Sequence, residues 1–431
     1  MTSATSMESN QSGEPSRLAQ TNVIAVEALT IVPDGEDFIV GDPRSSVYVV
    51  LPAIGVQVLE LLRSGRTLGE VSVHVHREIG RDVDVLGFAQ SLLDLGFASP
   101  AESVKETSEK MDWASRAAPR WLRRCFSPVA WVGYAASAIA AIALFAIRPT
   151  LFPRASDIFF LDTPVRSIAA LTVIIYALAA AHEGCHWLAA RAEGVSARIR
   201  ISRRLYFLTL EIDLTGLWSL PRRRRYSTLL AGMAFDTALL FPLLLARFGV
   251  GAGWWHLGDA TERLLAAVTF VQIMALTTQF WIFVRTDVYA VLITAAGCVN
   301  LSRVNQLMVR RTLRIMTPQQ EEELHDSHER DIAVARWYRW IYVLGIGAAI
   351  WFFVAYFAPS TIRLVTFIGA SIAHPVVGSE RFWEAILFGA LILSPRAITL
   401  TVALRDLRQW GKQRRITRED SQKSVYSAPV S

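Results

Sequence analysis

Two histidines flank a glutamate in the stretch of this chain whose residue types most clearly indicate catalytic or metal-binding chemistry. His182, Glu183 and His186 form an H-E-x-x-H sequence near the end of an apolar run over residues 164–192. On a helix the two imidazoles lie one turn apart on the same face, where both can bind one Zn²⁺. The glutamate between them is then placed to act as a general base in a zinc-dependent hydrolysis. The pattern therefore predicts a zinc site in a helix that is apolar enough to lie in a membrane.

A zinc ion held by two histidines needs a third protein ligand and an open coordination position. Asp287 follows another apolar run and is expected at the membrane depth of the histidines, so we predict it as that ligand. The alternative is a helix-end carboxylate paired with Arg285. Asp236 stands in the middle of a further apolar run, where an unpaired charge costs at least ~2.5 kcal/mol. We expect Asp236 to face the protein interior, where it tunes the site, binds the substrate backbone or makes a polar packing contact.

Composition places these residues in a membrane protein. The chain has 431 residues, of which 52% are apolar, and its mean hydropathy is +0.32. Such values indicate several membrane spans. Six are predicted, at residues 127–147, 164–192, 228–248, 264–284, 337–358 and 382–404. A further apolar stretch at 288–301 is too short to span a bilayer and is expected to be re-entrant or interfacial. Residues 1–20 lack the apolar core of a signal peptide.

The distribution of arginine predicts how the chain is oriented in the membrane. Arginine clusters occupy residues 116–124, 191–225, 303–336 and 405–415, and far fewer arginines occupy the alternate loops 148–163, 249–262 and 359–381. Because cytoplasmic loops carry the excess of positive charge, six spans with both termini in the cytoplasm fit every cluster. We therefore predict a multi-pass protein of the cytoplasmic membrane. Its histidine pair would lie about 10 Å below the cytoplasmic surface.

Residues 22–100 have the pattern of a small soluble domain. Runs of β-branched residues predict a hairpin and helical spacing predicts three helices, at residues 38–40 and 47–51 and at 52–62, 67–79 and 83–95. Thr67 and Glu70 match a capping box at the start of the second helix. A hairpin with three helices suggests a winged helix-turn-helix, whose usual ligand is DNA. Eleven acidic residues against five arginines repel phosphate, so we expect no nucleic-acid partner.

The arrangement over residues 32–98 resembles the PqqD-like peptide-recognition domain of ribosomal-peptide biosynthesis. The two share the strands, a helix-turn-helix around residues 61–67, and a last helix followed by Gly96 and Phe97. In that family a leader peptide adds as a strand at the edge of the hairpin and packs beside the last helix. The resemblance implies a leader peptide as partner. A winged helix with a purely structural role is the alternative.

Three elements in order make residues 165–300 resemble the site-2 protease family of intramembrane metalloproteases. The first is the H-E-x-x-H at 182–186. The second is A-G-M-A-F-D at 231–236, in place of that family's A-G-P-x-x-N. The third is T-D-V-Y at 286–289, in place of its D-G, so that Val288 stands where glycine is usual.

This second resemblance implies roles for individual residues. It implies zinc ligation by His182, His186 and Asp287. Glu183 would be the catalytic base, and Asp236 would replace an asparagine that holds the substrate strand. Alternating residues over 197–212 predict a β-hairpin beside the site, and its edge would receive an extended substrate peptide.

The expected fold is mostly α: a polytopic α-helical membrane protein of about six spans, with a small N-terminal α+β winged-helix domain and a cytoplasmic β-hairpin. The predicted order is a disordered tail at 1–21, the PqqD-like domain at 22–100, a basic linker at 101–126, the membrane metalloprotease domain at 127–404 and a basic tail at 405–431.

Three functions fit this organisation. The leading one is a zinc metalloprotease that cleaves a ribosomally made, modified peptide precursor near the cytoplasmic face, after its N-terminal domain has bound the leader. The second is regulated cleavage of a membrane signalling protein. The third is a non-catalytic component of peptide binding or export. The sequence carries no signature of an oligomeric state.

Overall fold

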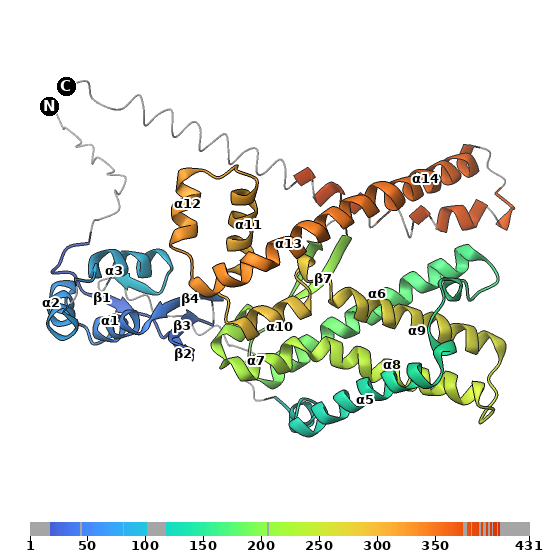
Figure 1. Cartoon of the computed structure of the whole chain (residues 1–431), viewed down its shortest axis with the longest axis horizontal. Helices are drawn as coiled ribbons and strands as arrows, with labels where there is room; N and C mark the ends of the chain where they lie inside the picture. The colour runs from blue at the N-terminus through green and yellow to red at the C-terminus, as the bar shows by residue number, and fades with distance from the viewer. Residues whose placement is uncertain are drawn as a thin grey trace, which may run out of the picture. The chain divides into compact units, whose positions relative to one another are not determined.

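α-Helices dominate the computed structural model of this chain (Figure 1). It describes residues 18–405 except 44, 81, 101–117, 205–206, 374–376, 381, 388, 391–393, 395–396, 399 and 403. Within these residues five helices are long and apolar enough to cross a membrane, or six if one bent helix pair counts as a span. A small β-sheet region with helices precedes them. The predicted fold class is thereby confirmed, whereas most of the two predicted tails lies outside the described residues.

The contacts divide the chain into two units, Met1–Trp113 with Thr215–Pro221, and Ala114–Leu214 with Arg222–Ser431. The first unit contains the strands β1 Ile24–Val26, β2 Thr30–Asp34, β3 Asp37–Asp42, β4 Val47–Pro52 and β5 Ala98–Pro100, and the helices α1 Ala53–Arg63, α2 Leu68–Ile79 and α3 Val85–Asp94. The antiparallel sheet has the order β2-β3-β4, and β1 pairs with β5. The predicted hairpin and three helices are confirmed, and β1, β2 and β5 add to them.

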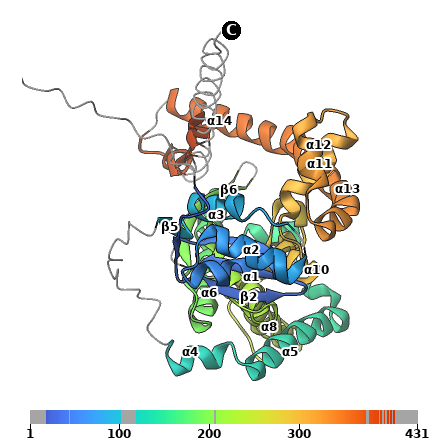
Figure 2. The same cartoon turned by 90° about the vertical axis from the view of Figure 1, so that its left-hand side faces the viewer.

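Local sequence explains how this first unit folds. Thr67 Oγ1 accepts a hydrogen bond from the Glu70 amide (3.3 Å), and Glu70 Oε2 accepts one from the Thr67 amide (3.0 Å), which confirms the predicted capping box. The three helices, drawn in blue in Figure 2, enclose a core with Leu59, Leu62 and Phe97 at its centre. Burial of such side chains contributes about 1.5–3 kcal/mol each.

The second unit contains the helices that carry the H-E-x-x-H sequence and Asp287. Its helices are α4 Arg120–Cys125, α5 Pro128–Ile147, α6 Pro164–Ala192, α7 Arg222–Leu229, α8 Ala231–Gly251, α9 Asp259–Gln279, α10 Asp287–Ala296, α11 Leu301–Thr312, α12 Pro318–His325, α13 Glu329–Phe352 and α14 Ala358–Ala373. Short turns of helix lie at Pro149–Leu151, Ala155–Ile158 and Ile282–Val284. The predicted hairpin is confirmed as β6 Arg198–Arg204 and β7 Phe207–Asp213, which pair antiparallel.

Helix α8 lies at the centre of this unit, packed against α5, α6 and α9 (Figure 1). Helix α6 begins as predicted, with Thr163 Oγ1 accepting from the Arg166 amide and Pro164 at the first helical position. It ends before Gly194, whose φ of 78° lies in the left-handed region. These signals set the register of α6 and hence which of its faces meets α8.

The predicted end of the fourth span at residue 284 is wrong. Helix α9 ends at Gln279, and the chain turns through Ile282–Val284 before α10 begins at Asp287. The apolar run continues across this break, so hydropathy cannot locate it. Helices α10 and α11 then meet at 91°, and α10 covers most of the stretch predicted to be re-entrant or interfacial.

The predicted loop at 359–381 is wrong over its first half, because α14 continues to Ala373. Pro359 does not stop it, since a π-helical turn at Phe353–Phe357 precedes the proline. Such a turn changes the local hydrogen-bond pattern where the proline lacks an N–H. The predicted span at 382–404 includes residues outside the described part of the chain, so it stays a prediction.

Candidate metal centre

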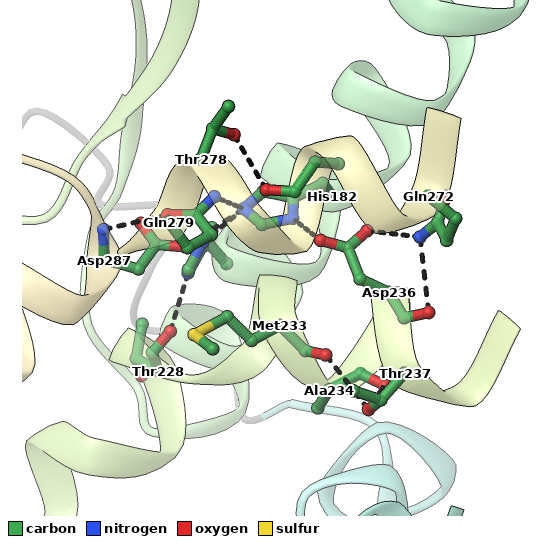
Figure 3. Close-up of polar contacts among 12 residues, drawn as sticks. His182, Thr228, Met233, Ala234, Asp236, Thr237, Gln272, Thr278, Gln279 and Asp287 are labelled. Atoms are coloured by element: carbon green, nitrogen blue, oxygen red, sulfur yellow. Dashed lines mark hydrogen bonds and ion pairs between the residues drawn. The ribbon is translucent and has the colours of Figure 1, made fainter. Parts of the chain in front are cut away.

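The side chains of His182 and His186 on α6 and of Asp287 on α10 converge on one point. Figure 3 shows His182 and Asp287 with their polar contacts. Nε2 of each histidine lies 3.0 Å from the same atom, Oδ2 of Asp287, and the two Nε2 atoms are 3.3 Å apart. His182 and His186 are 7% and 2% exposed. The three residues predicted to ligate zinc are therefore together in space.

The outer ring nitrogens determine which atoms face this point. Nδ1 of His186 lies 2.7 Å from the main-chain oxygen of Thr228, which can only accept, so this nitrogen carries a proton. Nδ1 of His182 lies 2.8 Å from Oδ2 of Asp236 and donates to that carboxylate. In the neutral imidazoles both Nε2 lone pairs then point inward, toward the Asp287 oxygen. Two lone pairs and a carboxylate oxygen that face one another repel unless a proton or a metal cation lies between them.

The spacing of these atoms fits a metal ion. A tetrahedral Zn²⁺ with bonds of about 2.1 Å separates its ligand atoms by about 3.4 Å. The separations here are 3.0, 3.0 and 3.3 Å, close to that value. Two imidazoles and a carboxylate suit Zn²⁺, and the same donor set occurs in iron(II) sites. The chain therefore holds a buried group of three residues that can bind a divalent metal.

The turn between α9 and α10 presents Asp287 to the histidines. Thr286 Oγ1 donates to the main-chain oxygen of Gln279 (2.5 Å), and the Asp287 amide donates to Oε1 of the same glutamine (3.1 Å). Arg285 adopts a φ of 61° and donates to Ser302. The alternative pairing of Asp287 with Arg285 is thus not what the structure shows. Val288 has a helical backbone, so the glycine usual there in the resembled family is not required by backbone conformation.

Asp236 faces the bundle interior, as its position in α8 predicts, and is 1% exposed. Its Oδ2 accepts from His182, and its Oδ1 accepts from Nε2 of Gln272 on α9 (2.7 Å). Both carboxylate oxygens thus have partners in the protein. These contacts fit the expectation that Asp236 tunes the site, while substrate binding by Asp236 stays a prediction.

Glu183 lies beside the triad and is tied to the hairpin. Its Oε2 accepts a hydrogen bond of 3.0 Å from the main-chain amide of Ile212 in β7. Ile212 pairs with Ile199 in the ladder, and its N–H points away from β6 toward α6. In an antiparallel pair, N–H groups on one edge recur at every second residue. The edge of β7 that holds Glu183 therefore also presents the main chain of Leu210 and Leu208.

Gly232 allows α8 to approach the histidine pair. A Cβ at this position would collide with Nε2 of His182 and with Nε2 of His186. Neither ring is free to move aside, because Asp236 and Thr228 hold their Nδ1 atoms. Glycine at 232 is therefore required by the lack of space beside the two histidines. Backbone conformation does not require it, because Gly232 lies within helix α8.

Two contributors to this centre, Gln272 and Gln279, escape a reading of the sequence by motif, whereas Gly232 lies in the A-G-M-A-F-D element without a predicted role. The two glutamines carry one usable signal, because uncharged polar side chains inside an apolar helix face the protein interior. For Gly232 the motif gives the position but not the contact with the histidines, since small residues are common in membrane helices. A search against protein families, curated proteins and solved structures finds no match for this chain.

Proposed function

We propose that this protein is an intramembrane zinc endopeptidase of the site-2 protease type. One observation carries the proposal. The Nε2 atoms of His182 and His186 and a carboxylate oxygen of Asp287 lie within 3.3 Å of one another, and a glutamate lies between the two histidines in helix α6. That helix is long and apolar enough to span a membrane. The combination supports hydrolysis in a membrane better than a structural metal site, which would use all four positions for protein ligands.

Glu183 acts as the general base in this proposal. It takes a proton from the attacking water and returns it to the amine that leaves when the peptide bond breaks. Zn²⁺, when bound by His182, His186 and Asp287, lowers the pKa of water and polarises the scissile carbonyl. The Ile212 amide holds the Glu183 carboxylate in place and leaves its second oxygen available for the proton.

The substrate is proposed to be a peptide in extended form. A helical substrate must unwind before its scissile amide is exposed. An unwound segment can then add, through main-chain hydrogen bonds, to the edge of β7 that faces away from β6. The acidic N-terminal unit, by its resemblance to leader-binding domains, would capture the leader of a modified-peptide precursor. Cleavage of a signalling protein and non-catalytic export are the competing functions. A small precursor gene beside this one favours the first of the three.

Metal removal tests the proposed function directly. Protein purified in lipid nanodiscs is expected to hold about one Zn²⁺ per chain and to cleave a precursor peptide added to it, as followed by mass spectrometry. Treatment with 1,10-phenanthroline should reduce cleavage to background, and Zn²⁺ should restore it. Restoration by Fe²⁺ but not by Zn²⁺ would identify a different metal, and full cleavage by metal-free protein would exclude the proposal.

Ile212→Pro tests the contact between the hairpin and Glu183. Proline removes the amide proton that Glu183 accepts but takes nothing from the β6–β7 ladder, because that N–H points away from β6. We expect kcat to fall about tenfold, the value of roughly one hydrogen bond to a charged group, with Zn²⁺ content unchanged. Ile212→Val keeps the amide and should retain wild-type kcat. An Ile212→Pro variant as active as wild type would show that the contact does not orient the base.

A further inference from the structure

Helix α9 presents two glutamines to the metal centre from one face. Gln272 and Gln279 are seven residues apart, close to two turns of helix, so both side chains point to the same side. We propose that they are positioning residues that hold the metal ligands in place, one by donating a hydrogen bond and the other by accepting one. This proposal rests on the metal site of the proposed function and extends it to a third helix.

Gln279 acts as an acceptor toward the carboxylate ligand, and its side-chain Nε2 lies 3.4 Å from Nε2 of His182. Its Oε1 lies 3.1 Å from the amide nitrogen of Asp287, which can only donate, so the oxygen of the side-chain amide must face it. Its own main-chain oxygen accepts from Thr286. These two bonds close the turn between α9 and α10, and the turn sets where the Asp287 carboxylate points.

Gln272 acts as a donor toward one histidine ligand. Its Nε2 lies 2.7 Å from Oδ1 of Asp236 and 3.3 Å from the Asp236 main-chain oxygen. Both are acceptors, so the nitrogen must face them. The bonds hold the Asp236 carboxylate, whose other oxygen accepts from Nδ1 of His182. Partners of this kind keep a histidine ligand in one tautomer and one orientation.

The burial of Gln272 supports the role of its side-chain nitrogen as a donor to Asp236. The side chain is 0% exposed, and its Oε1 has no hydrogen-bond partner among the described residues. An unpaired buried acceptor costs about 1–3 kcal/mol. Leucine or methionine would fill the same space in an apolar helix without that cost. An amide at this position is therefore explained by what its nitrogen donates to.

The donor and acceptor roles predict opposite results for the same substitution. Glutamate keeps one oxygen for the Asp287 amide and places its second oxygen where Nε2 of Gln279 lies 3.4 Å from Nε2 of His182. Gln279→Glu should therefore hold Zn²⁺ within about threefold of wild type. Gln272→Glu replaces a donor by a carboxylate against Asp236, so it should weaken Zn²⁺ binding about tenfold or more, as should both leucine variants. The affinity is measured by competition with a fluorescent chelator, and the Co²⁺ absorption spectrum reports the ligand geometry.

Thr269→Val is the matched control, because Thr269 is also buried in α9 and, among the described residues, its hydroxyl donates to the main-chain oxygen of Leu265 in its own helix. It should bind Zn²⁺ as wild type does. Unchanged affinity in both leucine variants would overturn the proposal, as would equal losses in Gln279→Glu and Gln279→Leu. Wild-type protein that binds Zn²⁺ with the expected pattern but cleaves nothing would leave this proposal standing while the proposed function fails. Wild-type protein that binds no Zn²⁺ would overturn both.

Discussion

Glu183→Gln is expected to lower the rate of peptide cleavage by about 10²–10⁴-fold, the usual contribution of a general base. Glutamine has the shape of glutamate but cannot take a proton from water. Its Oε1 can still accept the Ile212 amide, so the contact with β7 survives. Zn²⁺ content should not change, because Glu183 is not one of the three converging ligands. The readout is cleavage of a co-expressed precursor peptide, followed by mass spectrometry, together with metal analysis of the same preparation.

Glu193→Gln is the matched control for this prediction. Glu193 is the C-cap residue directly after α6, and it pairs with Arg224 at 2.6 Å. This variant should cleave at the wild-type rate, because Glu193 is not one of the converging metal ligands and glutamine keeps its shape. Processing that continues unchanged in Glu183→Gln would remove the protease function and favour a binding or export component. A new membrane-protein fragment seen only with active enzyme, with the precursor untouched, would favour regulated cleavage of a signalling protein.

Gly232→Ala is expected to disable the metal centre although it adds one methyl group. The new Cβ would occupy the space of Nε2 of both histidines. Their rings are held at Nδ1 by Asp236 and by the main-chain oxygen of Thr228. Either α8 or the histidine pair must shift, and overpacking of this kind costs about 1–3 kcal/mol. A displacement of about 1 Å can lower a catalytic rate about 10²-fold. We therefore expect both a loss of Zn²⁺ affinity and a loss of cleavage of about that size.

Gly184→Ala supplies the control within the same motif. An added Cβ at Gly184 meets nothing within 4 Å, although this residue lies between Glu183 and His186. Alanine also favours helix over glycine by about 1 kcal/mol. This variant should keep Zn²⁺ and activity, and it should be slightly more stable than wild type in thermal unfolding. Equal behaviour of the two alanine variants would contradict the close approach of α8.

Much of the framework follows from patterns that act over a few residues. Helix α6 could be placed because Thr163 and Pro164 mark its start and Gly194 its end, and capping depends only on neighbouring backbone. The break after Gln279 could not be placed, because the apolar run continues through it and hydropathy carries no information on backbone direction. Asp287 was predicted to meet the histidines, as it does, but its position at the start of α10 depends on bonds to Gln279 that no local pattern indicates.

The sequence by itself determined the chemistry that is available: two imidazoles on one helical face, a glutamate between them, and spans that bury them. Only the tertiary structure decided which atoms meet. It placed the Asp287 oxygen 3.0 Å from both imidazole nitrogens, assigned Asp236 to His182, and gave a reason for glycine at 232. The physical reason for this division is the distance along the chain over which each interaction acts. Periodicity and capping are local, whereas hydrogen bonds between side chains 36 to 105 residues apart depend on how α6, α8, α9 and α10 pack.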